Sequence, residues 1–134
     1  MLPPFVVSRL VVVVATIAGS RILQPGAVDV TRTEIPEAAL RPFFRFDAIF
    51  YHDVWQAGYT GPRAIYDVAF YPAYPALVRA IGFLIGHDLA ALLISNVCFL
   101  VGLMLVHRIA LRYLPEDRAA LAIWVLAVWP WAIF

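Results

Sequence analysis

Acidic, basic and aromatic residues are concentrated in one stretch of the chain, residues 44–79, which reads FRFDAIFYHDVWQAGYTGPRAIYDVAFYPAYPALVR. A carboxylate in such a stretch can act as a general base toward a hydroxyl group. Arginine and histidine side chains can stabilise negative charge that develops during a reaction. The stretch therefore holds residue types from which an active site could be built. The candidate carboxylates are Asp47, Asp53 and Asp67, and the candidate cations are Arg45, His52, Arg63 and Arg79.

Each candidate also has a purely structural interpretation. An aspartate beside a membrane span often caps a helix, which is the alternative for Asp47. Asp53 follows His52 directly, and neighbouring residues do not face each other on a helix, so we do not expect these side chains to pair. Asp67 could hold the loop instead of contacting a substrate. No two histidines or cysteines have the spacing of metal ligands, so the sequence predicts neither a metal nor another cofactor.

The composition places the chain in the membrane class. Of its 134 residues, 63% are hydrophobic and 14% are charged, whereas a soluble domain is about half apolar and about a quarter charged. The mean hydropathy of +0.84 agrees with this class. The ten basic residues are all arginine and are scattered, which excludes the basic patch of a nucleic-acid-binding protein. Cys98 lies in an apolar run and has no second cysteine with which to form a disulfide.

The apolar segments predict an all-α, polytopic membrane protein. A helix needs about 20 residues to cross the hydrocarbon layer. Residues 76–86 are too short to span alone, so they predict a re-entrant segment or a half-helix at the membrane interface. Residues 24–75 are expected to form a long external loop with six prolines, in which residues 46–57 could form a short interfacial helix. The predicted spans are residues 5–23, 89–107 and 119–134.

The arginines predict how the chain is oriented in the membrane. Arg108, Arg112 and Arg118 cluster between the last two apolar segments, which places this connector in the cytoplasm under the positive-inside rule. Residues 24–75 then lie on the external side of a bacterial plasma membrane or, in a eukaryote, on the luminal side of the endoplasmic reticulum. The alternative for the first segment is a signal peptide, with Arg9 before an apolar core. The later apolar segments favour an uncleaved span.

Several short motifs follow one another in residues 45–134, namely Phe46-Asp47, Gly58-Tyr59, the segment from Ala69 to Pro75, Val78-Arg79, Ile94-Ser95-Asn96 and Trp129-Pro130. Their order resembles that of the PIG-V family of mannosyltransferases, which belongs to the GT-C superfamily of polytopic glycosyltransferases. Two departures are Phe46, where the family has tryptophan, and Tyr71, where it has a second phenylalanine; both keep an aromatic ring.

The resemblance implies a membrane-embedded enzyme that transfers a hexose, with mannose expected, from a polyprenyl or dolichyl phosphate to a glycan or glycolipid acceptor. Its partners would be the lipid-linked donor, the acceptor and membrane lipids. By the same resemblance Asp47 is the expected general base. Tyrosines and Trp55 could stack on a sugar or anchor the loop among the lipid headgroups. The residues expected to bind substrate are Arg45, His52, Asp53, Arg63, Asp67 and Arg79.

Members of this family have many more membrane helices than the sequence shows. The resemblance therefore implies the N-terminal part of a GT-C helical bundle, a single incomplete domain that is inactive on its own. The alternative is a small non-enzymatic integral membrane subunit or assembly partner, whose aromatic loop is a docking surface. A transporter is less favoured, because transporters place ionisable groups inside their spans, and here those groups lie in loops and at helix ends.

Overall fold

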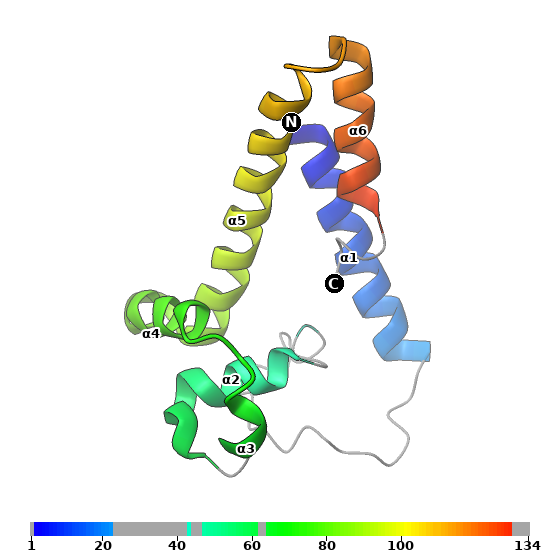
Figure 1. The fold of residues 1–134 in the computed structure, drawn as a ribbon. Coiled ribbons are helices and arrows are strands. Elements are labelled where there is room, and N and C mark those ends of the chain that lie inside the picture. The colour runs from blue at the N-terminus through cyan, green and yellow to red at the C-terminus, as the bar shows by residue number, and fades with distance from the viewer. Residues whose placement is uncertain (1, 23–42, 44–46, 62–63, 130–134) are drawn as a thin grey trace. The chain divides into compact units, whose positions relative to one another are not determined.

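The computed structural model describes residues 2–22, 43, 47–61 and 64–129, and all regular structure within these residues is helical (Figure 1). This confirms the predicted all-α class. Two compact units share the chain: unit 1 is built from residues 1–19 and 95–134, and unit 2 from residues 20–94. The helices are α1 (Leu2–Ile22), α2 (Ala48–Ala57), η2 (Gly58–Thr60), α3 (Ala64–Asp67), α4 (Ala73–Ile85), α5 (His87–Ala110) and α6 (Glu116–Val128).

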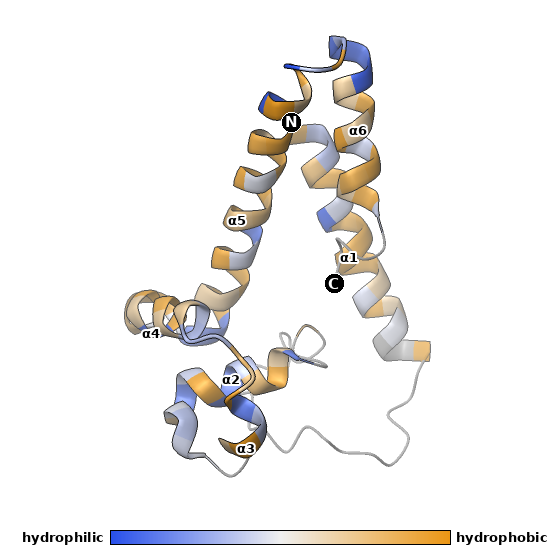
Figure 2. Cartoon of the chain, in the orientation of Figure 1, coloured by the Kyte–Doolittle hydropathy of each residue, from blue (hydrophilic) through white to orange (hydrophobic). Residues whose placement is uncertain are grey.

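Two helices in the described part of the chain are long and apolar enough to cross a membrane, namely α1 and α5. At 1.5 Å per residue, α5 is about 36 Å long, which exceeds the hydrocarbon thickness of about 30 Å. Figure 2 shows hydrophobic residues along most of both helices and hydrophilic residues where α6 begins. These helices agree with the predicted segments 5–23 and 89–107.

Prolines explain why two helices begin earlier than predicted. Pro3 and Pro4 lie in the first turn of α1, and Pro75 lies in the first turn of α4. A proline is tolerated there because its missing N–H would have had no partner within the helix. Thus α1 begins at Leu2 and α4 at Ala73, so α4 is longer than the expected segment 76–86.

The predicted third span corresponds to α6. This helix begins at Glu116, not at residue 119, and Glu116 and Asp117 occupy its first turn, where the helix dipole favours negative charge. Its 13 described residues are too few to cross the hydrocarbon layer. Residues 130–134 lie outside the described part of the chain, so this span stays a prediction.

Unit 2 has a core shared by α2, α4 and the first turns of α5. Its buried members are Trp55, Val78, Ala90, Ala91 and Ile94, and Tyr74 packs against them. Helix α2 packs on α4. The segment 24–75, which was predicted to be an external loop, is largely helical where the structure describes it.

Unit 1 has its own small core, in which Leu103 of α5 packs with Ile123 and Ala127 of α6. The rings of Phe5 and Phe99 flank this core, with their centroids 6.2 Å apart. The guanidinium carbon of Arg9 lies 4.4 Å from the centroid of the Phe99 ring. The arginine near the start of α1 is thus stacked on an aromatic ring of α5.

Candidate functional site

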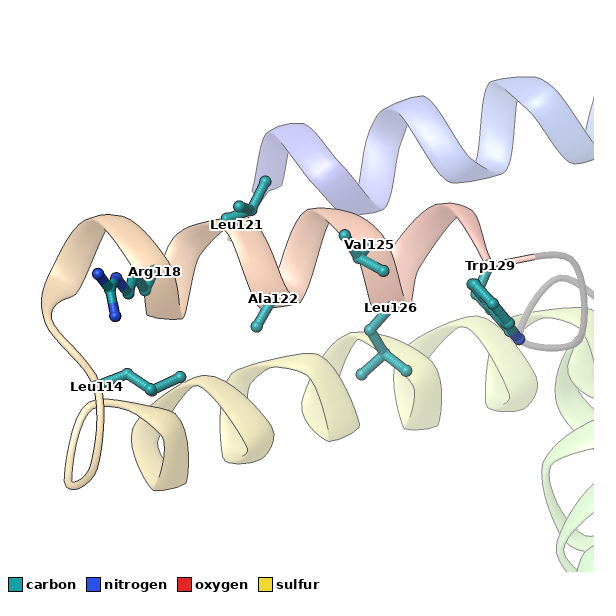
Figure 3. A pocket seen from close by; sticks show the side chains of 7 residues that line it. All are labelled: Leu114, Arg118, Leu121, Ala122, Val125, Leu126 and Trp129. Atoms are coloured by element: carbon teal, nitrogen blue, oxygen red, sulfur yellow. The ribbon is translucent and has the colours of Figure 1, made fainter.

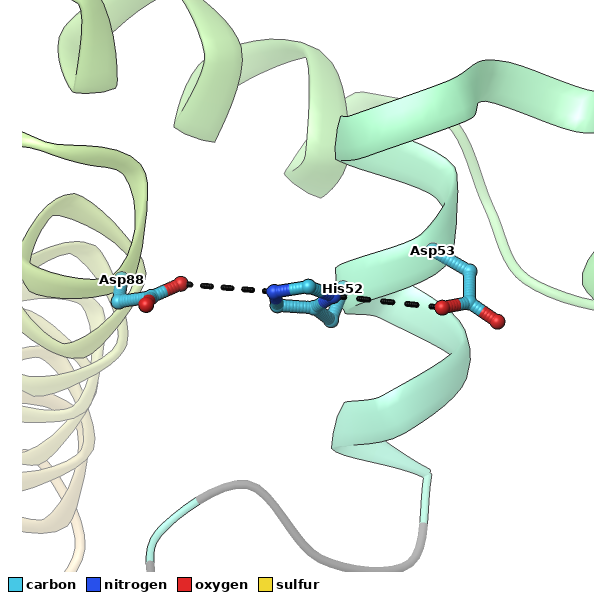
Figure 4. A network of polar contacts seen from close by, with 3 residues as sticks. All are labelled: His52, Asp53 and Asp88. Atoms are coloured by element: carbon cyan, nitrogen blue, oxygen red, sulfur yellow. Dashed lines mark ion pairs between the residues drawn. The ribbon is translucent and has the colours of Figure 1, made fainter. Parts of the chain in front are cut away.

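A buried histidine lies between two carboxylates in unit 2 (Figure 4). His52 Nε2 is 3.7 Å from Asp88 Oδ1, and His52 Nδ1 is 4.0 Å from Asp53 Oδ1. Both distances exceed hydrogen-bond length, so these contacts are electrostatic and become ion pairs when the imidazole is protonated. The three residues therefore connect α2 to the first turn of α5.

Helix geometry and packing explain how the histidine is held. Asp88 lies in the first turn of α5, where the helix dipole favours a carboxylate. The ring of Trp55 meets that of His52 edge-on, with centroids 5.1 Å apart. His52 is 3% exposed and Trp55 is 2% exposed, so both rings belong to the interior of unit 2. Trp55 therefore packs in the core instead of offering a face to a sugar.

The contact between His52 and Asp53 differs from the expectation that these neighbours would not pair. Successive residues on a helix point in different directions, which was the reason for that expectation. An electrostatic contact at 4.0 Å does not require the two side chains to share a helix face. The carboxylate can approach one ring edge while Asp88 approaches the other (Figure 4).

Two of the short motifs meet in the structure through Tyr59 and Phe70. The hydroxyl of Tyr59 donates a hydrogen bond of 2.7 Å to the backbone carbonyl of Phe70. The ring of Phe70 stacks on Phe50 and meets Tyr51 edge-on, with centroids 5.0 Å apart in each pair. The Gly-Tyr motif and the aromatic-proline motif thus fold the segment after α3 onto α2.

Tyr74, in the same aromatic-proline motif, connects α4 to α5. Its hydroxyl donates a hydrogen bond of 3.0 Å to the backbone carbonyl of Ala91. Pro75 is buried, whereas Tyr71 is 82% exposed. Phe70, Tyr74 and Pro75 of this motif therefore have structural roles, since the first two pack or hydrogen-bond with neighbouring helices and the third is buried in the first turn of α4.

Asp47 stands immediately before α2, at the N-cap position. Its backbone carbonyl accepts hydrogen bonds from the N–H groups of Phe50 and Tyr51, at 3.1 and 3.2 Å. Its side chain makes no capping hydrogen bond. The residue is exposed, so its carboxylate is accessible to a partner.

The other predicted site residues fall into three groups. Asp53 and Asp67 are buried, and Asp67 is fully enclosed at the end of α3. Arg79 is exposed on α4. Arg45 and Arg63 lie outside the described residues. The structure thus separates accessible candidates, Asp47 and Arg79, from enclosed ones.

Asp88 was not among the predicted site residues, although it completes the contacts of His52. The sequence did contain a signal for Asp88. This acidic residue directly precedes the apolar segment that begins at residue 89, and acidic residues are enriched where helices begin. Within the described residues, no group of three His, Cys, Asp or Glu side chains could hold a metal ion.

The chain matches no family model, no curated protein and no solved structure. The resemblance to the PIG-V family therefore rests on the motifs of residues 45–134 alone.

Proposed function

We propose that this chain belongs to a membrane-embedded glycosyltransferase in which Asp47 is the general base. A general base must come within hydrogen-bond reach of the attacking hydroxyl group. Of the three candidate carboxylates, Asp47 is exposed, whereas Asp53 and Asp67 are buried. The accessibility of Asp47 is the observation that carries this proposal.

The enclosed polar residues act in this proposal by positioning α2. Asp47 begins α2, and His52, five residues further along that helix, is held by Asp88 of α5. The base is therefore carried on a helix whose orientation is set by packing and charge. In this proposal His52, Asp53 and Asp67 are assigned as positioning residues, because they are enclosed within unit 2 whereas Asp47 is exposed.

The donor in this proposal is a hexose, with mannose expected, on a polyprenyl phosphate. Helices α1 and α5 would cross the membrane, and the first turns of α5 belong to unit 2. Arg79 is an exposed cation of unit 2 and is assigned to the phosphate of the donor. The sugar acceptor would approach Asp47 from the aqueous side.

The test is Asp47→Asn in the protein as it occurs in its own membrane. Asparagine is as good an N-cap as aspartate, so α2 is expected to persist. Transfer of radiolabelled mannose from polyprenyl phosphate mannose should fall by about 10²- to 10⁴-fold. Asp117→Asn, which removes an exposed carboxylate of α6, is the matched control and should leave transfer unchanged. Wild-type transfer by Asp47→Asn would remove Asp47 from the mechanism.

A second candidate function is that of a non-enzymatic membrane subunit. The exposure of two aromatic side chains in unit 2, Tyr71 at 82% and Phe83 at 87%, favours it, because aromatic residues are enriched at protein–protein interfaces. This function predicts that Phe83→Ser lowers the native mass of the complex extracted from the membrane, whereas Asp47→Asn does not. Mannose transfer that depends on Asp47 would rule it out.

A further inference from the structure

An apolar groove runs along one face of α6 in unit 1 (Figure 3). Its lining residues recur every three or four positions, so they form one stripe along the helix. Figure 3 shows that Ala122 and Leu126 point toward α5. The groove has a volume of about 630 Å³ and is lined by Leu114, Arg118, Leu121, Ala122, Val125, Leu126 and Trp129.

One end of the groove is positively charged. Arg118 lies at the end where the chain enters α6, and Trp129 lies at the opposite end (Figure 3). Arg118 is the one charged residue among those that line the groove, since Glu116 and Asp117 do not line it. An exposed guanidinium beside an apolar channel suits a ligand with an anionic head and a hydrocarbon tail.

The length of the groove fits one leaflet of a bilayer. From Arg118 to Trp129 the helix rises by about 16 Å, and half of the hydrocarbon layer is about 15 Å thick. With Arg118 at the depth of the lipid phosphates, an acyl chain in the groove would end near the middle of the membrane. Glu116, Asp117 and Arg118 at this end of α6 are the polar residues expected at a membrane surface.

We propose that this groove is a binding site for one phospholipid, with an acyl chain against Ala122 and Leu126 and the headgroup phosphate on Arg118. The site rests on the insertion of α1 and α5 in the membrane and is independent of glycosyl transfer. The ligand class is an anionic diacyl phospholipid, because the groove offers a single cation for a phosphate and an otherwise apolar wall.

Two substitutions distinguish the contribution of the lipid headgroup to binding from that of the acyl chain. Arg118→Gln removes the charge and keeps a side chain of similar reach. Ala122→Phe fills the middle of the groove, and because Ala122 is exposed the larger ring does not enter the core. Arg112→Gln is the matched control, since Arg112 is an exposed arginine of the connector that does not line the groove.

The experiment is native mass spectrometry of the full chain in detergent, titrated with phosphatidylglycerol or with diacylglycerol, which lacks the phosphate. The wild-type chain should retain one phosphatidylglycerol. Arg118→Gln should weaken that binding by about tenfold or more, as expected for a charge-assisted contact, and leave diacylglycerol binding unchanged. Ala122→Phe should weaken the binding of both lipids, and Arg112→Gln that of neither.

Two results would overturn the proposal. One is equal binding of phosphatidylglycerol by the wild-type chain, Arg118→Gln and Ala122→Phe. The other is wild-type binding of diacylglycerol as tight as that of phosphatidylglycerol, which would exclude the phosphate contact. Circular dichroism of each variant shows whether its helices are intact. Neither result depends on mannose transfer, so failure of this proposal and failure of the proposed enzyme function are distinguishable.

Discussion

His52 Nε2 and Asp88 Oδ1 lie 3.7 Å apart and join the middle of α2 to the first turn of α5. Their side chains are 3% and 12% exposed, so solvent screens the contact only weakly. The contact connects an element of the predicted active site to a helix long enough to cross a membrane. Loss of either side chain removes one electrostatic contact from the interior of unit 2, and His52 keeps its contact with Asp53 when Asp88 is lost.

The first prediction concerns this pair. We expect Asp88→Asn and His52→Gln each to lower the free energy of unfolding by about 1 kcal/mol, because the pair is longer than a hydrogen bond and His52 also contacts Asp53. The double variant should lose less than the sum, with a coupling free energy of about 0.5–1 kcal/mol. Denaturation in detergent micelles, monitored by circular dichroism, measures the free energy of unfolding of the two single variants and the double variant. Strictly additive losses would show that the two side chains do not interact.

The second prediction concerns the turn between α4 and α5. A Cβ atom at Gly82 would lie 2.5 Å from His87 Cδ2 and 2.7 Å from His87 Cα. Since backbone must move as well as a side chain, Gly82→Ala should lower the free energy of unfolding by about 1–3 kcal/mol.

Gly102→Ala is the control for this substitution. Gly102 lies within α5, and a Cβ atom there has nothing within 4 Å. Alanine forms helix better than glycine by about 1 kcal/mol, so this variant should be as stable as wild type or more stable. Equal destabilisation by the two variants would contradict the close approach at Gly82.

The third prediction concerns the hydrogen bond between the Gly-Tyr motif and the aromatic-proline motif. Tyr59→Phe removes the hydroxyl that donates to the Phe70 carbonyl at 2.7 Å, and should lower the free energy of unfolding by about 1 kcal/mol. Tyr71→Phe removes the same atom from a residue that is 82% exposed, and should have an effect below about 0.5 kcal/mol. Thermal melts of the two variants measure both losses of stability. If Tyr71→Phe lowers the free energy of unfolding more than Tyr59→Phe does, the hydrogen bond from Tyr59 to Phe70 does not stabilise the fold.

The fourth prediction concerns Arg9 and Phe99 in unit 1. The stacked guanidinium, 4.4 Å from the ring centroid, should give a coupling free energy of about 0.5–2 kcal/mol in a cycle of Arg9→Gln and Phe99→Leu. The same cycle with Arg112→Gln in place of Arg9→Gln should give no coupling, because Arg112 is exposed on the connector. Coupling in both cycles would point to a general effect of positive charge.

Much of the secondary structure could be predicted because it depends on local chemistry. The apolar runs of α1 and α5 are long enough to be recognised by length and hydropathy alone. The short helix expected at residues 46–57 is present as α2. Its end follows from Gly58, whose φ of 68° lies in the left-handed region that favours glycine. The first residues of α1 and α4 were less predictable, because a proline usually indicates the end of a helix, whereas here prolines lie in the first turn.

The residue types of the candidate site could also be predicted from the sequence, but the solvent accessibility of their side chains could not. Asp47, Asp53 and Asp67 are equivalent as carboxylates in a polar, aromatic stretch, and only packing makes the first exposed and the other two buried. Asp88 lies beside His52 because α2, α4 and the first turns of α5 share one core, which brings together residues far apart in the chain. Helices form from nearby residues, whereas burial and charge pairing depend on which distant segments pack together.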